Sequence, residues 1–380
     1  MSADRIRVGI VGLKPGESWA GVAHVPALQS MPDRFVIAGV ANSRLESSRA
    51  AAEALGIPRA FANADELIAS PDIDAVTVTI TVPQHLPVVK SALEAGKHLH
   101  CEAPLGNGLA EVEAMAALAR GNDGVAVVGL QARVAPPVLY LRALLTEGFV
   151  GRVLSSSVSG WGGNWGPTAE NLARLGYLLD AGNGATMLTI PLGHTLAALR
   201  DVLGDVTEVS ALVDTRVPEV RSADDGSTLT MTAPDQILLT ARLESGAPIS
   251  VHYQGGMPNG TAGFTWDIHG TEGDLRVTAP FGHTQMAPLS LFGAKAGSGR
   301  LQPIEVPPRF AEGAPEEPVP GNVTRNYARM AQDIRTGSRR ASSFDDALGL
   351  QRLIDAIETS ARSGSRVMLA PSNRAVPLPE

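Results

Sequence analysis

The sequence predicts an α/β fold in two parts: an N-terminal doubly wound parallel sheet of the Rossmann type, and a C-terminal, mostly antiparallel sheet with its own helices. Two observations predict the first part. Short β-branched runs alternate with alanine-rich helical stretches, and the first run ends at Gly12 just before a helix start. For the second part, strand-like runs after Gly151 follow one another with a single helical stretch among them.

The first domain is expected at residues 1–150. Right-handed crossovers bring the carboxyl ends of parallel strands to one edge of the sheet, where ligands bind. Gly12, Asn42, Val82 and Glu102 all fall at such ends, so four loops predict one ligand site. The predicted strands cover residues 6–13, 35–41, 74–81 and 97–101, and the predicted helices cover residues 22–28, 45–55 and 87–95.

The second domain is expected at residues 151–321, and the C-terminal helices and tail at 322–380 are expected to brace the first domain. Residues 293–321, rich in Gly, Pro and Glu, predict a long surface excursion. One sheet face is expected to carry no helices, which predicts a homodimer or homotetramer through that face. The predicted strands cover residues 152–160, 206–215, 235–243, 249–254, 265–269 and 274–277, and the helices cover 185–203, 322–336 and 344–364.

The composition predicts a cytoplasmic protein without a membrane or nucleic-acid partner. A formal net charge of −8 and the lack of basic clusters argue against phosphate backbones. No apolar run reaches the roughly 18–20 residues of a membrane span, and the first residues lack a signal-peptide pattern. The single cysteine, Cys101, excludes an intrachain disulfide. The eight histidines are scattered without metal-ligand spacing, so no metal site is expected.

The turn after the first strand has the order that a dinucleotide site requires: strand, glycine turn and helix start. A helix N-terminus offers unpaired N–H groups to a pyrophosphate, and glycine lets the backbone approach it. The match to G-x-G-x-x-G is imperfect, because Lys14 stands at the second glycine position. Taken alone, the turn is equally consistent with an ordinary strand-to-helix connection.

The end of the second strand bears on the choice between NAD and NADP. An acidic residue there accepts hydrogen bonds from the ribose 2′-hydroxyl and repels a 2′-phosphate. This chain has Asn42-Ser43-Arg44 instead, and a hydroxyl with a guanidinium suits a phosphate. The pattern favours NADP without excluding NAD. The alternative is that Ser43 caps the following helix and Arg44 is solvated.

Several short motifs resemble one known family. Residues 95–98 read Ala-Gly-Lys-His and residues 101–104 read Cys-Glu-Ala-Pro, where the glucose-fructose oxidoreductase/inositol dehydrogenase (Gfo/Idh/MocA) family has A-G-K-H and C-E-K-P. The likeness covers nearly the whole chain and is greatest to the subgroup of the fungal galactose-regulon repressor. It implies an NAD(P) cofactor and a carbohydrate substrate. Further motifs that resemble the family lie at residues 82–85, 129–133, 147–151 and 268–273, and those that resemble the subgroup lie at 16–20, 102–106 and 183–186.

Taken with the strand ends, the resemblance predicts a set of cofactor contacts. Trp19 is expected to cover the cofactor, with packing as its alternative, and His85 is expected to support the cofactor loop. The full set in addition to Asn42, Ser43 and Arg44 is Gly12, Leu13, Lys14, Gly16, Ser18, Trp19, Thr81, Val82, Pro83, His85, Glu102, Ala103 and Gln131.

Two of the three acid/base groups that the resemblance implies are absent. The family lysine of E-K-P, which holds the reacting hydroxyl, is Ala103 here. The family aspartate four residues before a histidine is Ile190, while the histidine is retained as His194. A histidine with a pKa near ~6.5 still exchanges protons at neutral pH. Tyr177 and Asp180, three residues apart, would share one face if that stretch were helical.

Each candidate site residue has a structural alternative. His194 on an apolar helix can be a hydrogen-bonded core residue, and Asp180 can cap the turn at residues 181–183. Tyr177 can be packed by its ring. The residues expected to contact substrate are Arg133, Trp161, Trp165 and Asn183; Arg133 can instead pin a loop, and the two indoles form a wall for a pyranose ring or pack inside the protein.

Three functions are consistent with the sequence. The first is an NAD(P)-dependent sugar oxidoreductase in which His194 or Tyr177 moves the hydroxyl proton. The second is a glycosidase that uses NAD for transient oxidation, elimination and return of hydride, with Asp180 as an extra acid/base. The third is a non-catalytic NAD(P) sensor that binds a protein partner, as the repressor resemblance implies.

Overall fold

The computed structural model describes residues 5–370 and divides into two compact units. The first unit ends at Gln131 and resumes over Gly313–Leu348. The second unit covers Ala132–Glu312 and resumes at Gly349. The boundaries at 150 and 321 expected from the sequence therefore differ from this division, in which the chain returns to the first unit after the second sheet and then leaves it again.

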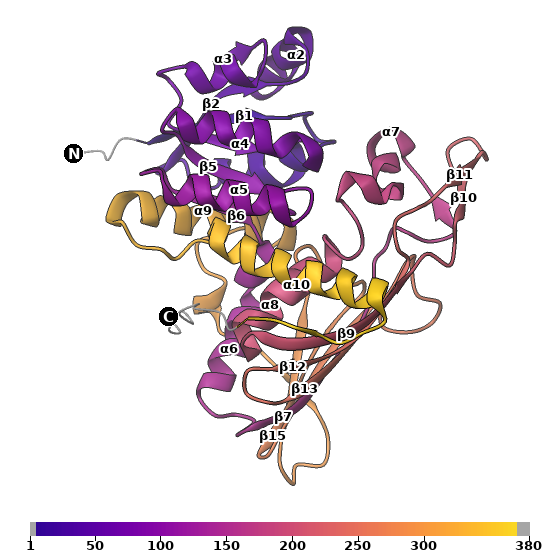
Figure 1. The fold of residues 1–380 in the computed structure, drawn as a ribbon. Helices are drawn as coiled ribbons and strands as arrows, with labels where there is room; N and C mark the ends of the chain where they lie inside the picture. Colours follow the sequence, from indigo (N-terminus) through magenta and orange to yellow (C-terminus); the bar gives the residue numbers. More distant parts are fainter. Residues whose placement is uncertain (1–4, 371–380) are drawn as a thin grey trace. The chain divides into compact units, whose positions relative to one another are not determined.

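The first unit contains a six-stranded parallel sheet of the order β3-β2-β1-β4-β5-β6 (Figure 1). The order reverses between β1 and β4, which is the switch point of a doubly wound sheet. The predicted Rossmann sheet is thus confirmed. The strands are β1 (Ile6–Val11), β2 (Phe35–Ala41), β3 (Ala60–Phe61), β4 (Ala75–Val78), β5 (His98–Glu102) and β6 (Ala126–Gly129).

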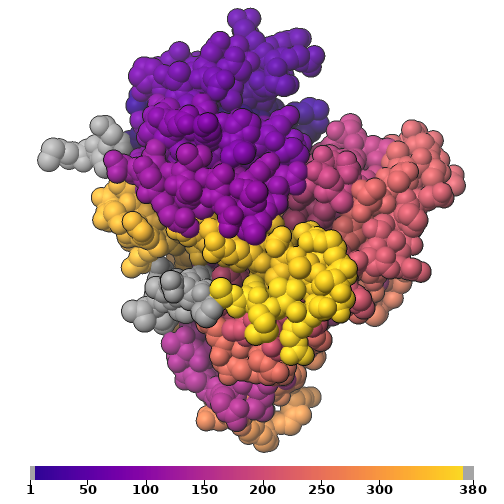
Figure 2. Space-filling view, viewed as in Figure 1, coloured from indigo at the N-terminus to yellow at the C-terminus, as the bar shows by residue number. Residues whose placement is uncertain are grey.

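Helices cover both faces of this sheet. Val8 and Ile10 of β1 belong to a core that includes Tyr327 of α9, whereas a Cβ on Gly9 would meet Leu67 of α3 on the opposite face. In Figures 1 and 2 the gold segment of α9 lies against the violet residues of this unit. The helices are η1 (Ala20–His24), α1 (Val25–Gln29), α2 (Leu45–Leu55), α3 (Ala64–Ala69), η2 (Val82–Gln84), α4 (His85–Glu94), α5 (Leu109–Arg120), α9 (Pro318–Thr336) and the start of α10 (Phe344–Ser363).

The second unit contains a nine-stranded sheet in which β7 and β13 pair in parallel and the other neighbours are antiparallel. Side chains of β12 alternate between buried and exposed, so one face of the sheet meets the core and the other faces solvent. In sheet order the strands are β17 (Gln302–Ile304), β16 (Ser290–Lys295), β15 (Gly273–Ala279), β14 (Phe264–Gly270), β7 (Val153–Trp161), β13 (Pro248–Gln254), β12 (Gln236–Leu243), β9 (Val206–Asp214) and β18 (Val367–Met368).

Short elements complete the second unit. A three-stranded sheet of the order β11-β10-β8 was not predicted, because its strands are too short to show alternation. Its strands are β8 (Thr168–Ala169), β10 (Glu219–Ser222) and β11 (Thr228–Thr230), and the remaining helices are η3 (Gln131–Val134), α6 (Pro136–Thr146), α7 (Leu172–Leu175), η4 (Gly176–Leu179), η5 (Ala181–Asn183), α8 (Pro191–Leu203) and η6 (Pro308–Phe310).

Two expected elements need correction. The helix expected from residue 185 begins at Pro191, because proline at the first position disfavours a helical Ile190, whose φ and ψ are −99° and −85°. The excursion expected at residues 293–321 contains the end of β16 and all of β17, which pair as an antiparallel hairpin. The many Gly and Pro residues of that stretch hid its strand pattern. No helix within residues 5–370 is long and apolar enough to cross a membrane.

Candidate functional site

A pocket of about 1110 Å³ lies at the carboxyl ends of β1, β2 and β4 in the first unit. This is the edge and the switch point at which a doubly wound sheet binds a dinucleotide. Eight predicted cofactor residues line the pocket together: Gly12, Leu13, Lys14, Ser18, Asn42, Ser43, Arg44 and Thr81.

The turn after β1 has the shape that a dinucleotide site needs. Gly12 has a φ of +95°, and a Cβ there would lie 2.7 Å from Ile80 Cγ2. Ser18 Oγ accepts the Lys14 N–H at 2.8 Å and donates to the Lys14 carbonyl, which closes the turn. A Cβ on Gly21 would lie 2.5 Å from the Lys14 carbonyl oxygen. Gly21 was missed in the sequence, because it lies outside the G-x-G-x-x-G spacing.

Other pocket residues were also missed. Ser47, Ala50, Ala51 and Ala54 form one face of α2 along the pocket, and their small side chains leave room for a ligand. These positions follow Arg44 and are three and four residues apart, the spacing that places side chains on one face of a helix, and this spacing was the signal in the sequence. The open volume, the glycine turn and the Arg44 guanidinium together fit a dinucleotide.

Eight other predicted cofactor residues do not line this pocket: Gly16, Trp19, Val82, Pro83, His85, Glu102, Ala103 and Gln131. Trp19 packs against the hydrophobic core of the first unit. His85 is buried, and its ring nitrogens lie 3.0 Å from the carbonyl oxygens of Leu105 and Ile80. His85 thus joins the segments after β5 and β4, and its support of a cofactor loop stays a prediction.

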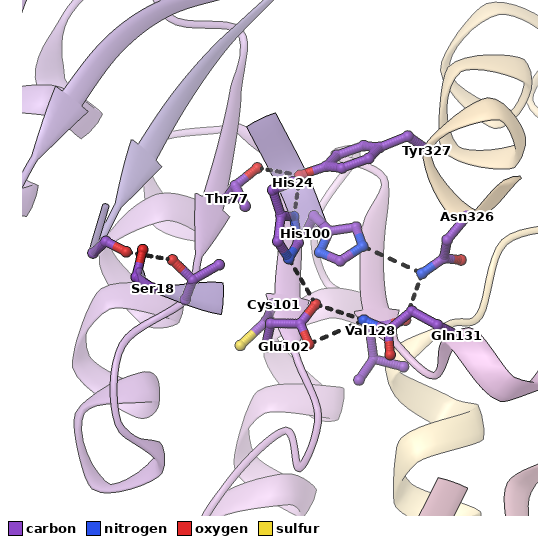
Figure 3. A network of polar contacts seen from close by, with 12 residues as sticks. Ser18, His24, Thr77, His100, Cys101, Glu102, Val128, Gln131, Asn326 and Tyr327 are labelled. Carbon is purple, nitrogen blue, oxygen red and sulfur yellow. Dashed lines mark hydrogen bonds and ion pairs between the residues drawn. The ribbon is translucent and has the colours of Figure 1, made fainter. Parts of the chain in front are cut away.

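Glu102, at the end of β5, is the centre of a buried hydrogen-bond network (Figure 3). His24 Nε2 lies 3.0 Å from Glu102 Oε1, and the Gln131 amide donates to both carboxylate oxygens at 2.8 and 3.0 Å. The other His24 nitrogen lies 2.8 Å from the hydroxyl of Tyr327, which is also 2.8 Å from Thr77 Oγ1. The network links η1, β5, Gln131 and α9 within the first unit.

The charges in this network follow from its contacts. Burial alone would raise the pKa of Glu102, but the His24 and Gln131 hydrogen bonds and the nearby imidazoles outweigh it and hold that pKa below 4.5. Burial and the neighbouring His24 lower the pKa of His100 to about 3, so His100 is neutral near pH 7. Glu102 is therefore an ionised carboxylate with both oxygens already hydrogen-bonded inside the protein.

Histidines that are scattered in the sequence meet here. His24, His100 and Glu102 offer donor atoms within 4.8 Å of one another, a spacing that invites comparison with a metal site. The Asn326 amide donates to His100 Nε2 at 3.2 Å, which places the ring proton of neutral His100 on Nδ1. His24, His100 and Glu102 are thus members of a hydrogen-bond network. That the protein has no metal site stays a prediction.

In the second unit, His194 lies in the first turn of α8 and is 2% exposed. Arg133 is buried, and its Nε lies 2.6 Å from Asp201 Oδ2. This ion pair matches the alternative that Arg133 pins a loop. Trp165 is also buried, and its indole N–H donates to the Leu178 carbonyl at 2.9 Å, so its ring is packed inside the unit. Trp161 ends β7 and is partly exposed.

Tyr177 and Asp180 do not share a helix face. Tyr177 lies in η4, whereas Asp180 has extended backbone and caps η5 by accepting the Gly182 N–H at 2.8 Å. Partial burial raises the pKa of Tyr177, and Arg174 opposes that rise. Tyr177 is 37% exposed and stays a neutral phenol at neutral pH. The Asn183 amide donates to the Tyr177 carbonyl at 2.8 Å, which holds the turn together.

Comparisons with known proteins agree with this architecture. Residues 6–130 match the family model described as "Oxidoreductase family, NAD-binding Rossmann fold", and residues 136–279 match "Gal80p, C-terminal domain". The dehydrogenase aclE of Aspergillus oryzae is 30% identical, over 95% of this chain and 97% of its own.

Two solved structures are similar along the whole chain. The super-repressor mutant of Gal80p from Saccharomyces cerevisiae has a TM-score of 0.87 and 26% identity, and covers 96% of this chain and 98% of its own. Levoglucosan dehydrogenase in complex with NADH and levoglucosan has a TM-score of 0.83 and 23% identity, over 97% and 100% of the two chains, which is a likeness of fold.

Acidification is expected to destabilise the first unit through His100. A histidine in the unfolded chain takes up a proton as the pH falls below about 6.5, whereas folded His100, with a pKa of about 3, does not. The resulting loss of stability begins near pH 6.5 and continues toward pH 3, and it reaches roughly 2 kcal/mol at pH 5 for this group. Urea unfolding followed by circular dichroism at pH 7, 6 and 5 measures it.

The matched variants are His100→Gln and His269→Gln. His100→Gln should lessen the dependence of the unfolding free energy on pH, because one of the buried histidines whose pKa is lowered is gone. His269 is 48% exposed on its side chain, and its replacement is the surface control for the same measurement. Parallel curves for His100→Gln and the unaltered chain would contradict the assignment.

Proposed function

Because the chain belongs to the Gfo/Idh/MocA family of NAD-binding oxidoreductases, we propose that it transfers hydride between a sugar, or sugar derivative, and NAD(P). The observation that carries the proposal is the dinucleotide-sized pocket at the switch point of the first sheet, with the glycine turn closed by Ser18. The dehydrogenase relative matches 95% of the chain, so the likeness extends beyond the nucleotide-binding half. The substrate is a ring hydroxyl or the corresponding ketone.

In this proposal, the residues of the second unit handle the substrate proton. A bound nicotinamide accepts or donates the hydride. His194 acts as the acid/base, because the lysine and aspartate of other family members are replaced by Ala103 and Ile190. Tyr177 stays protonated at neutral pH and donates a hydrogen bond to the substrate oxygen. Asp180 is taken up by capping η5, so it contributes to the turn and not to proton transfer.

NADP(H) is the favoured cofactor in this proposal. Ser43 and Arg44 line the pocket after β2, where an acidic residue would select NAD. Lys14 forms an exposed ion pair with Glu17 at 2.6 Å, so its charge is partly neutralised. The Arg44 side chain forms no hydrogen bond or ion pair within residues 5–370 and is available to a 2′-phosphate.

A second candidate is a regulator that binds NAD(P) and a protein partner without turnover. Two observations favour it: the 0.87 TM-score with a Gal80p structure, and the loss of both the lysine and the aspartate. A binding protein needs the cofactor pocket but no acid/base group. The two candidates therefore share the cofactor pocket and differ in whether acid/base groups act on a substrate.

An assay panel distinguishes the candidates. Aldoses, sugar acids and aryl glycosides are incubated with NAD(H) and NADP(H), and absorbance at the reduced-nicotinamide band is followed. The proposed oxidoreductase changes this absorbance with at least one sugar. Tight cofactor binding with no change on any substrate would instead support the regulator, and aglycone release without net reduction would identify a glycosidase.

Replacing His194 tests its role once a substrate is found. His194→Ala should lower turnover by roughly 100-fold, the scale of a lost general acid/base, while cofactor affinity stays within about twofold. Ala103→Lys is the contrasting variant. It should not raise turnover, because the new ammonium lacks the aspartate that other family members carry at the position of Ile190. Turnover that survives His194→Ala, or rises strongly in Ala103→Lys, would refute the assignment.

A homo-oligomer through the second sheet is also part of the proposal. Leu212 of β9 and Leu238 of β12 are paired across the strands and are 67% and 41% exposed. Two adjacent exposed leucines on an uncovered sheet face suit a second copy of the same face. Light scattering should give at least twice the 39.5 kDa chain mass, and Leu212→Glu should reduce it to one chain. A single-chain mass for the unaltered protein would contradict this.

A further inference from the structure

Asn42 stands where an acidic residue would read the cofactor ribose, but its side chain is already engaged. Its Oδ1 accepts the Leu13 N–H at 2.7 Å, and its Nδ2 donates to the Leu13 carbonyl at 2.9 Å. The same Nδ2 donates to the Ser47 carbonyl at 3.2 Å. Both N–H bonds of the amide are therefore used inside the protein, and none is left for a ligand.

These contacts hold the glycine turn from one side. Leu13 directly follows Gly12, whose left-handed backbone has a φ of +95°, and the backbone N–H and carbonyl of Leu13 both bond to the Asn42 amide. The Ser18 hydroxyl likewise bonds to both the backbone N–H and the carbonyl of Lys14. The backbone N–H of Asn42 in turn donates to Ser48 Oγ at 2.9 Å, which ties the turn to α2.

A carboxylate could not replace this amide. Asn42→Asp keeps one acceptor for the Leu13 N–H, but it loses both donated hydrogen bonds. It also places an anionic oxygen against the carbonyl oxygens of Leu13 and Ser47, which is repulsive. At this position an acidic residue that reads a ribose would therefore disturb the turn that carries the pyrophosphate.

We propose that Asn42 is a positioning residue for the glycine turn and does not read the ribose, so that the choice between NADP(H) and NAD(H) rests with Arg44, as in the proposed function. This inference rests on the proposed NAD(P) binding. Arg44 lines the same pocket two residues farther on, at the N-cap of α2, with extended backbone. A guanidinium there meets a 2′-phosphate as a charge-assisted, bidentate partner, whereas the 2′-hydroxyl of NAD gains little from it.

The experiment is calorimetric titration of the full chain and its variants with NAD⁺ and NADP⁺. Asn42→Asp should weaken both cofactors by about tenfold and leave their affinity ratio within roughly twofold, because the turn serves both. Arg44→Asp should weaken NADP⁺ by roughly 100-fold and change NAD⁺ by less than about threefold. The unaltered chain should bind NADP⁺ at least as tightly as NAD⁺.

Asn122→Asp is the matched control. The Asn122 amide also clamps backbone on both sides, since it accepts the Gly124 N–H and donates to the Leu93 carbonyl, and it is not among the residues that line the pocket. This control should lose stability as Asn42→Asp does but keep both affinities. Loss of both affinities in the control would mean that general destabilisation, and not the turn, explains the Asn42 result.

Two outcomes would overturn the inference. The first is an Asn42→Asp variant that binds NAD⁺ more tightly and NADP⁺ less tightly, because residue 42 would then read the ribose. The second is an Arg44→Asp variant with an unchanged ratio. If Asn42→Asp fails to fold, hydrogen exchange of the Leu13 amide is measured in the unaltered chain. Protection of this amide supports its hydrogen bond to Asn42, and exchange at the rate of an exposed amide contradicts it. If the unaltered chain binds neither cofactor, the proposed function fails first.

Discussion

The structure of the first unit depends on an ionised carboxylate buried at the end of β5. Desolvation makes a buried charge costly unless hydrogen bonds compensate for it. Glu102 receives that compensation from His24, in the segment after the glycine turn, and from Gln131, after β6. Tyr327 of α9 contacts the other ring nitrogen of His24, so the network also joins a C-terminal helix to the sheet.

Several residues predicted to contact a ligand also use their polar side-chain atoms for contacts inside the protein. Asn42, Asp180, Asn183 and Arg133 were candidates because their side chains are polar and follow strands or lie near turns. In the structure each one is hydrogen-bonded or ion-paired to its own unit. Turns and strand ends leave unpaired backbone groups that side chains must satisfy, so polar residues at these positions serve the fold.

The two units retain different parts of the family pattern. The first keeps the pocket, the glycine turn and the small-residue face of α2, so its capacity for a dinucleotide follows from geometry. The second keeps His194 but has Ile190 in place of the aspartate. The position of the family lysine, Ala103, lies in the first unit, and the position of the family aspartate, Ile190, lies in the second, so both units depart from the family pattern.

Local patterns in the sequence were sufficient to determine the two sheets, the bounds of β2 and α2, and the edge of the sheet where a ligand binds. Strand alternation and helix periodicity are properties of short segments, so they can be read without knowing the fold. The tertiary structure alone decided that His24, His100 and Tyr327 gather around Glu102, since these residues are up to 303 positions apart in the chain. It also decided that Asn42 holds the turn at Leu13. Such pairings depend on which segments pack together, and no spacing along the chain encodes them.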